Sequence, residues 1–171
     1  MRARPKKSRL PSRKASNASR VRYFLDTEYN GFGGALISLA LVPEHGDDEF
    51  YAILKCPDPI LPWVERHVMP YLGTVPVGLT HPALDRLDAA EALSAYLVGD
   101  IAPEIVADWP EDIAHFCMLV LTKSGDMVHL APTIFSLLRL PGFSTAANSK
   151  VPHNALHDAR ALRDHVLATD A

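Results

Sequence analysis

The chain has 171 residues, 48% of them hydrophobic, which is enough for one domain with a buried core and calls for no second domain. Nine of the 17 Lys and Arg residues fall within the first 22 positions and none of the 20 Asp and Glu residues does, so the rest of the chain carries a net charge of about −12. This acidic body should not attract a polyanion unaided. The lack of any apolar run near the roughly 20 residues needed to cross a bilayer excludes a membrane-spanning protein.

The N-terminal segment, residues 1–20, is rich in Arg, Lys and Ser and poor in apolar side chains. Such a composition cannot build a core, so we predict a disordered basic tail over residues 1–20 and a folded domain over residues 21–171. A transit peptide shares the composition but should be amphipathic, which this segment is not. Two interpretations stay open: a solubilising arm, or an arm that attracts nucleic acid electrostatically.

Three apolar runs follow, at residues 21–25, 33–43 and 49–56. An acidic turn with a glycine, residues 44–48, separates the second run from the third. Runs of this length bounded by turn residues predict three strands, joined as an antiparallel meander.

The two cysteines, Cys56 and Cys117, lie far apart in the sequence and lack CxxC spacing. No secretory leader is recognisable before them. We therefore expect reduced, buried thiols in a cytoplasmic protein.

Helical spacing becomes the dominant pattern after the meander. It predicts a short helix within residues 61–72, closed by Pro70, and a longer helix at residues 83–98. Asp88 and Glu91 are placed like a capping pair in the longer helix.

The second half of the chain alternates strand and helix patterns. A brief apolar run at residues 104–109 suits a buried strand, and helix-like spacing follows at residues 110–121. Residues 127–140 are ambiguous, and we predict a helix after a strand there. Residues 154–170 predict a terminal helix whose apolar face comprises Leu156, Ala159, Leu162, Val166 and Leu167. Strands first, then alternating helix and strand, predict an α/β fold with a mixed sheet flanked by helices.

Asp26 and Glu28 stand two residues apart at the end of the first apolar run, in the stretch RYFLDTEYNGFG. In a strand, residues i and i+2 face the same side, so both carboxylates would project together from the edge of a buried sheet. Two like charges held so close require a compensating cation or an uneven sharing of protons. The pair is a weak signal by itself, because the pattern often arises by chance.

Two further segments carry residues of matching chemistry. Asp112 lies just inside the helix that follows the short buried strand, and His153 precedes Asp158 by five residues at the start of the terminal helix. If the three segments meet, four carboxylates converge, and two Mg²⁺ or Mn²⁺ ions would remove their repulsion. The all-oxygen ligand set argues against zinc.

Such a pair of ions activates water and stabilises the leaving oxygen in an attack on a phosphodiester. A neutral His153 can take the proton from that water. Each of these residues also has a simpler structural interpretation when it is considered alone. Asp112 would be an acid that the helix dipole favours in the first turn, and His153 would be a residue at a helix start that bonds to the backbone.

The order of the three segments resembles a known family. LDTE at residues 25–28, DWPED at 108–112 and HNALHD at 153–158 resemble the three motifs of the DEDDh 3′-to-5′ exonucleases, and the likeness extends from about Val21 to Leu167. RYFLDTEYNG together with VPHNALHDARALRDH is similar to the small bacterial adenosine-specific exoribonucleases. The resemblance implies a ribonuclease H-like fold, in which three antiparallel strands are followed by parallel additions.

Carried across residue by residue, the resemblance implies Asp26, Glu28, Asp112 and Asp158 as ligands of two Mg²⁺ or Mn²⁺ ions, and His153 as the general base. It implies hydrolysis of single-stranded 3′ ends to nucleoside 5′-monophosphates, with RNA preferred to DNA and with adenylate tails as the preferred RNA. Because small relatives commonly form homodimers, a homodimer is also compatible with it.

The middle motif departs from the family pattern. Many relatives carry HNxxFD, whereas this chain has ADWPED, with Asp108 where Asn is usual and Glu111 where an aromatic residue is usual. Asp108 therefore rivals Asp112 as a ligand. We favour Asp112 because an apolar helix pattern follows it, and Asp108 would then order a water or the terminal ribose.

The residues that we assign to substrate contact lie beside the first and middle motifs: Thr27, Tyr29, Asn30, Asp108 and Trp109. Trp109 would stack on a base, and the residues after Glu28 would let the backbone approach the terminal nucleotide. A plain glycine-rich turn and simple burial are the alternatives.

Three other functions compete with an exoribonuclease. A DNA exonuclease of the proofreading or repair type would use the same metals. A nucleic-acid-binding module that has lost catalysis would be expected to show a damaged set of acids, yet all five residue types are present. An entirely structural interpretation has to treat three motifs in the right order as an accident.

Overall fold

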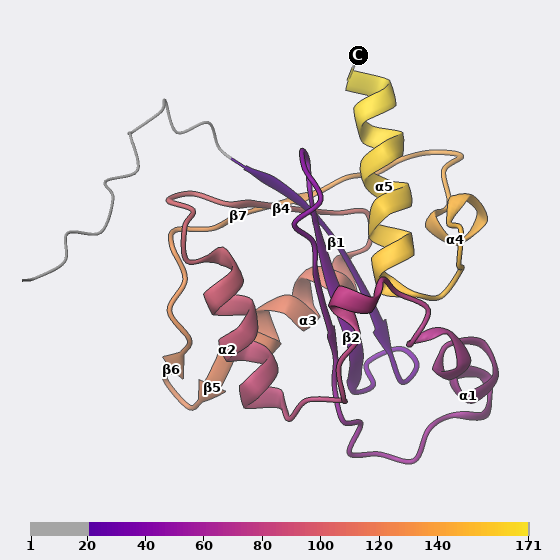
Figure 1. Ribbon diagram of the computed structural model, residues 1–171, viewed down its shortest axis with the longest axis vertical. Helices are drawn as coiled ribbons and strands as arrows, with labels where there is room; N and C mark the ends of the chain where they lie inside the picture. The colour runs from indigo at the N-terminus through magenta and orange to yellow at the C-terminus, as the bar shows by residue number, and fades with distance from the viewer. Residues whose placement is uncertain (1–20, 171) are drawn as a thin grey trace, which may run out of the picture.

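A computed structural model describes residues 21–170 and contains a five-stranded mixed sheet with the strand order β3-β2-β1-β4-β7 (Figure 1). The first three strands form the predicted antiparallel meander, and β4 and β7 extend the sheet in parallel on the other side of β1. The predicted mixed sheet is therefore confirmed. The strands are β1 (Arg22–Tyr29), β2 (Leu36–Pro43), β3 (Phe50–Ile53), β4 (Glu104–Ala107) and β7 (Ile134–Leu137).

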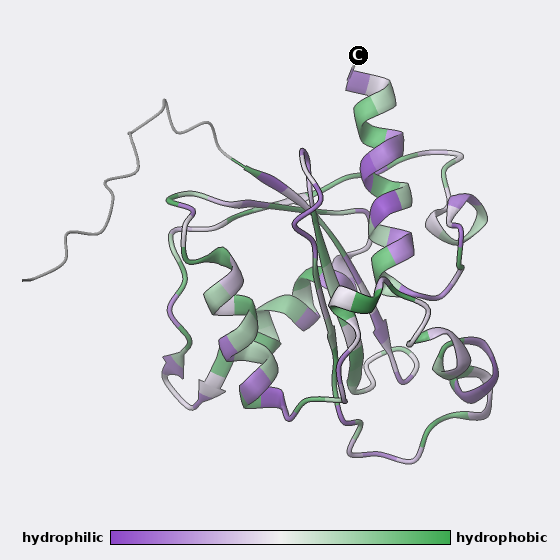
Figure 2. Ribbon diagram, in the orientation of Figure 1, coloured by the Kyte–Doolittle hydropathy of each residue, from purple (hydrophilic) through white to green (hydrophobic). Residues whose placement is uncertain are grey.

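Helices cover both faces of this sheet. Helices α2 (Arg86–Leu97) and α3 (Pro110–Val120) lie on one face and α5 (Ala155–Asp170) on the other (Figure 1). Neighbouring residues of a strand point to opposite faces, so Leu25 packs in the core with α2 and α3 whereas Phe24 packs with α5. Figure 2 shows the hydrophobic strands between these helices. The result is a three-layer arrangement with β1 in the middle of the central layer.

Strand β1 is longer than predicted, because pairing with β2 continues to its end, with Asp26 opposite Ala40 and Glu28 opposite Ser38. The two acids therefore lie within a central strand rather than beyond the end of one. Strand β4 pairs with β1 only over residues 22–24. Past Phe24 no described strand pairs with β1 on that side, and the backbone N–H of Thr27 instead donates to the side chain of Asp112.

The predicted helix within residues 127–140 is wrong. That segment contains the end of a two-stranded hairpin and then β7, which pairs in parallel with β4. The apolar pattern there is ambiguous by itself, and the free edge of β4 decided the outcome through long-range hydrogen bonds. The hairpin strands are β5 (Leu121–Lys123) and β6 (Asp126–Met127).

The predicted capping pair in α2 is also wrong, because the helix begins at Arg86 and both Asp88 and Glu91 lie inside it. Asp85 occupies the N-cap position without a side-chain capping bond. The remaining helices are α1 (Pro62–His67), which ends before Pro70 as predicted, the short 3₁₀ helices η1 (Met69–Tyr71) and η2 (Val77–Leu79), and α4 (Thr145–Asn148).

The remaining predictions concern the terminal helix, the cysteines, membrane-spanning helices and the N-terminal segment. The terminal helix has the predicted apolar face, although Leu167 is only half-buried. Cys56 and Cys117 are free thiols, but both are half-buried rather than buried as predicted, because each lies at the margin of the core. Within residues 21–170 no helix is long and apolar enough to span a bilayer. The predicted basic tail, residues 1–20, lies outside the described residues.

Candidate active site

The first two acids of the site project from one face of β1. Phe24 packs against α5, and residues two and four positions further along a strand share its face, so Asp26 and Glu28 also point towards the α5 side. Asp26 is only 8% exposed, whereas Glu28 is half-buried. Both carboxylates therefore lie where the N-terminal end of α5 meets the sheet.

The N-terminal end of α5 supplies the next two groups. Asn154 caps the helix, since its side-chain Oδ1 accepts hydrogen bonds from the backbone N–H groups of Leu156 and His157. Its Nδ2 donates to the carbonyl of Tyr71, which fixes this turn against η1. The cap places Asp158 one turn into α5, where it is 4% exposed.

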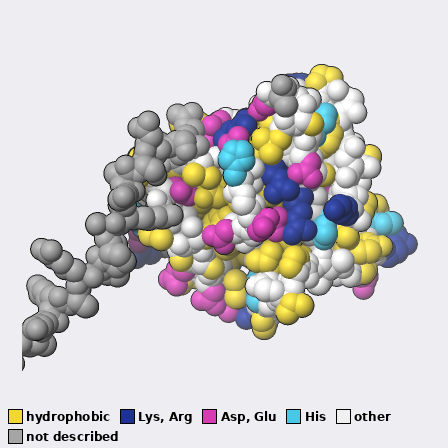
Figure 3. Space-filling model, turned by 45° about the horizontal axis from the view of Figure 1, so that its top comes forward, with side chains coloured by type: hydrophobic (Ala, Val, Ile, Leu, Met, Phe, Trp, Pro, Cys, Tyr) yellow, Lys and Arg dark blue, Asp and Glu magenta, His cyan; other side chains and the backbone are white. Residues whose placement is uncertain are grey.

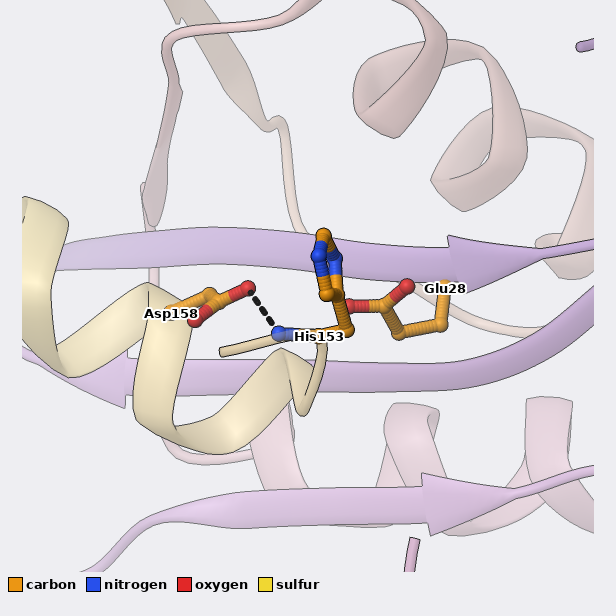
Figure 4. Close-up of side chains that lie close together, drawn as sticks. All are labelled: Glu28, His153 and Asp158. Atoms are coloured by element: carbon orange, nitrogen blue, oxygen red, sulfur yellow. Dashed lines mark hydrogen bonds between the residues drawn. The ribbon is translucent and has the colours of Figure 1, made fainter. Parts of the chain in front are cut away.

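His153 lies directly before this cap. Its backbone N–H donates to Oδ2 of Asp158 over 3.1 Å (Figure 4). One ligand atom each from Glu28, His153 and Asp158 lie within 4.8 Å of one another. Glu28 is more than 120 residues away in the sequence from His153 and Asp158. Among the described residues these three side chains are the one group of at least three whose ligand atoms have the spacing of a metal site.

The backbone at His153 is strained, with φ at +62°, a value that non-glycine residues seldom adopt. Strain of this kind costs about 1–3 kcal/mol and persists only where the surrounding contacts impose it. The hydrogen bond to Asp158 and the Asn154 cap impose it here. The cost is consistent with a side chain whose position matters for function.

Asp112 reaches the site from the opposite face of the sheet. It lies in the first turn of α3, is 3% exposed, and accepts hydrogen bonds from the backbone N–H and the hydroxyl of Thr27, at 3.2 and 2.6 Å. Thr27 stands between Asp26 and Glu28 and points to the α3 side of β1. One strand thus presents two acids to α5 and holds a third acid from α3 by the residue between them.

Burial raises the pKa values of these carboxyl groups, and their mutual repulsion adds to the effect. The pKa of Asp26 rises well above its ordinary value through burial and the nearby charges of Asp112 and Asp158. Burial together with Asp158 and Asp112 raises the pKa of Glu28 to about 8. Among the described residues that line the cavity there is no Lys or Arg, so no cationic side chain of this part of the chain offsets these shifts.

For the other two carboxyl groups, hydrogen bonds partly offset the rise in pKa. Burial raises the pKa of Asp112 to about 7, although the Thr27 hydroxyl opposes the rise. Burial raises the pKa of Asp158 to about 6, against the hydroxyl of Ser149 and the N–H of His153. The Oδ1 atom of Asp158 is buried without any hydrogen-bond partner. A divalent cation would satisfy that atom and relieve the repulsion between the acids.

Asp108 lies next to the same acids, one residue beyond β4. It is half-buried, burial raises its pKa, and its charge raises the pKa values of Asp26, Asp112 and Asp158. Asp112 is the more buried of the two rivals and is oriented by two hydrogen bonds. Both carboxylates line the cavity, so both are candidates for the ligand role.

The site opens into a cavity of about 580 Å³. All five residues predicted as catalytic line it, as do Thr27, Tyr29, Asp108 and Trp109 from the predicted substrate contacts. Asn30 does not line it, because its side chain is bound to backbone groups, donating to the carbonyl of Pro59 and accepting from the N–H of Leu61. Asn30 instead fastens the end of β1 to the segment before α1.

Aromatic side chains flank the acids, and two of them were not among the residues assigned to the site from the sequence. Trp63 of α1 is 50% exposed, and its ring lies edge-on to the His153 ring with the centroids 5.1 Å apart. Phe32 is 85% exposed, and the centroid of its ring lies 6.5 Å from that of the Trp109 ring. Both line the cavity. Neither was recognisable from sequence, because an isolated aromatic residue carries no signal of which cavity it faces.

The turn that carries Phe32 is fixed by glycines and by Glu111. Gly31 has φ at +77°, and a Cβ at this position would approach Leu61 to 2.7 Å. The N–H of Gly33, also at positive φ, donates to Oε1 of Glu111 over 2.6 Å. Glu111 therefore ties this turn to α3.

Comparison with known proteins adds no identification. The chain matches no protein-family model and no curated protein sequence. The assignment of function therefore depends on the site itself and on the resemblance of its motifs.

Proposed function

We propose that this protein is a metal-dependent 3′-to-5′ exoribonuclease that hydrolyses single-stranded RNA ends to nucleoside 5′-monophosphates. The observation that carries the proposal is the convergence of Asp26, Glu28, Asp112, Asp158 and His153 on one cavity, whose described lining residues include no Lys or Arg. Buried like charges without compensation destabilise a fold, and they persist mainly where a function requires them.

The donor set suits two Mg²⁺ or Mn²⁺ ions, which would be held by Asp26, Glu28, Asp112 and Asp158. All four groups offer hard oxygen atoms, and Oδ1 of Asp158 lacks any other partner. When bound, such ions supply charge neutralisation at the carboxylates and Lewis-acid activation of water and of the leaving oxygen. Because the acids have raised pKa values, protons compete with the ions, and binding should strengthen as the pH rises.

His153 is the proposed general base. Burial, together with the charge of His67, lowers the pKa of His153, so its ring is neutral at pH 7 and can accept a proton. The ring is held by the strained backbone and by the edge of Trp63, which limits its orientations. In the proposed reaction the imidazole accepts the proton of the attacking water, and the phosphodiester breaks at the 3′ oxygen of the penultimate nucleotide.

The substrate class follows from the aromatic side chains and from the resemblance. Phe32, Trp63 and Trp109 are exposed at the cavity, and unpaired bases stack on such rings whatever their sequence. RNA over DNA, adenylate tails and a homodimer are implied by the family resemblance alone. The sheet order, three antiparallel strands followed by two parallel ones, supports a ribonuclease H-like fold as part of the proposal.

The decisive experiment is hydrolysis of 5′-labelled A-tailed RNA, with matched DNA alongside, in Mn²⁺ or Mg²⁺ and in excess chelator. We expect a ladder that shortens from the 3′ end and disappears with chelator and in Asp26→Ala. The ratio of the RNA rate to the DNA rate distinguishes an exoribonuclease from the rival DNA exonuclease. If the wild type binds RNA but cleaves none, the proposed enzymatic function is refuted and a binding module takes its place.

A further inference from the structure

A second cavity, of about 620 Å³, lies along α5 and has no role in the proposed chemistry. Its wall includes Lys150, Arg160 and Arg163, together with His157. Figure 3 shows Lys and Arg side chains gathered over α5, with Asp and Glu side chains beside them. Because the chain beyond its first 22 residues has only eight Lys and Arg residues, three of them at one cavity is a marked concentration.

The two cavities share one wall. In α4 and the residues that follow it, Thr145 and Ala146 line the first cavity whereas Asn148 and Lys150 line the second. At the start of α5, Asp158 faces the first cavity and its neighbour His157 faces the second. A strand whose last nucleotide occupies the first cavity can therefore reach the second by crossing residues 145–158.

Lys150 is the cation best placed to bind an anion there. Within residues 21–170, only Arg66, Arg139 and Lys150 among the Lys and Arg side chains form no hydrogen bond or ion pair with a described residue. All three are exposed, but Lys150 alone lines a cavity described here. An unpaired cation attracts phosphate without first giving up another partner.

The other charges of the second cavity differ in availability. Arg160 is held by Glu49 through two hydrogen bonds, of 2.7 and 2.5 Å, and is largely neutralised. Among the described residues Arg163 pairs only with its exposed neighbour Asp164, a weak surface contact, so its guanidinium can also bind a ligand. Asp47 and Asp48, with Glu49, belong to the turn between β2 and β3. These acids would repel an anion and direct it to the side of Lys150.

We propose that this second cavity binds backbone phosphates of the RNA upstream of the scissile bond, with Lys150 as the principal phosphate ligand and Arg163 as the second. The inference rests on the proposed exoribonuclease function and extends it, because it predicts that longer RNA binds more tightly than the shortest substrates. It also assigns a direction to the strand, which leaves the first cavity over α4 rather than over α1.

The test uses the full chain with Lys150→Gln, and Arg66→Gln and Arg139→Gln as matched controls that remove equally exposed, unpaired cations. An adenylate octanucleotide and a dinucleotide are compared as substrates in Mn²⁺. For Lys150→Gln we expect KM of the octanucleotide to rise about five- to tenfold with kcat unchanged, and the slope of log KM against log salt to fall by about 0.7. KM of the dinucleotide should stay unchanged, because it does not reach the second cavity.

Equal KM values for wild type and Lys150→Gln on the octanucleotide would overturn the proposal, and so would an effect of the same size from Arg139→Gln. A large effect of Arg66→Gln with a silent Lys150→Gln would overturn it by directing the strand over α1. Thermal melting of each variant establishes that the fold is intact.

A binding measurement separates this inference from the proposed reaction. Fluorescence anisotropy of the labelled octanucleotide is followed with Asp26→Asn in Mg²⁺, with and without Lys150→Gln. A five- to tenfold weaker binding of the double variant supports the phosphate subsite even if the wild type cleaves nothing, an outcome that would refute only the exoribonuclease. Equal binding of the two variants refutes the subsite whatever the wild type cleaves.

Discussion

The two cavities on either side of residues 145–158 have similar volumes, about 580 and 620 Å³, but opposite electrostatic design. In the second cavity Glu49 is paired with Arg160, and the unpaired charges of the wall are exposed. In the first cavity Asp26, Asp112 and Asp158 are buried beside one another, and no Lys or Arg of residues 21–170 lines the wall.

This difference is the reason for placing the proposed chemistry in the first cavity. The charges of the second cavity, whether paired like Arg160 and Glu49 or exposed like Lys150, cost the fold little stability. Uncompensated buried carboxylates cost stability, as the raised pKa values of Asp26 and Glu28 indicate. Cavity volume does not distinguish the two sites, whereas the burial of unpaired charge does.

The largest effect should come from removing a buried acid of the first cavity. We expect Asp112→Asn to lower kcat/KM at least about 10³-fold, because it removes a ligand charge oriented by Thr27, and Asp108→Asn to lower it by no more than about tenfold. Steady-state kinetics with parallel Mn²⁺ titration measures both. Weaker Mn²⁺ binding in Asp108→Asn than in Asp112→Asn would reverse the assignment of the ligand.

Loss of the base should have the next largest effect. His153→Ala should lower kcat about 100-fold, within the usual range for a general base. The wild-type rate should fall as the pH drops below the ordinary pKa of histidine, since burial keeps the ring neutral above it, and the variant should lack that acidic limb. His67→Ala is the matched control, because removing its charge should move the limb of the wild type to higher pH. A limb that persists in His153→Ala would assign it to another group.

The aromatic side chains should affect binding more than chemistry. Phe32→Ala and Trp63→Ala should each raise KM by about 5- to 30-fold, within the roughly 1–3 kcal/mol of a base stacked on a ring, whereas kcat should change less. Tyr71→Ala is a suitable control, because Tyr71 is exposed but does not line the cavity. Unchanged KM in both variants would show that bases do not stack there.

The smallest effect concerns stability without metal. A carboxyl group whose pKa is raised in the folded state binds more protons than in the unfolded chain, so its contribution to stability is present at low pH and is lost as the pH rises through the folded pKa. The ordinary values of about 4 and the raised values of Asp158, Asp112 and Glu28, about 6, 7 and 8, define a window from about pH 4 to about pH 8.

Over that window Tm of the metal-free protein should fall by roughly 5–10 °C, and saturating Mn²⁺ should abolish most of the fall. Glu28→Gln should flatten the dependence of Tm on pH, because it removes the group with the highest of these three pKa values. Differential scanning calorimetry in chelator and in Mn²⁺ measures the effect. A Tm that rises with pH in chelator would contradict the buried, uncompensated cluster.

Local sequence determined the elements that carry the site. The apolar run that leads into Asp26 predicts a strand, and the polar HNALHD turn before an amphipathic pattern predicts the helix start that holds Asp158. These signals are local because alternation, helical spacing and capping depend on residues only a few positions apart. The same spacing placed His153 five residues before Asp158, which the Asn154 cap brings within hydrogen-bonding distance.

Tertiary structure alone decided what lies between and around those elements. The continuation of β1 through Glu28, the strand β7 in place of a helix, and the position of Trp63 beside His153 all depend on partners distant in sequence. The joining of the two cavities by residues 145–158 has the same origin. The sequence by itself thus determined which acids could act together, and the packing of α3 and α5 on opposite faces of β1 decided that they meet in one buried place, where desolvation gives them their chemistry.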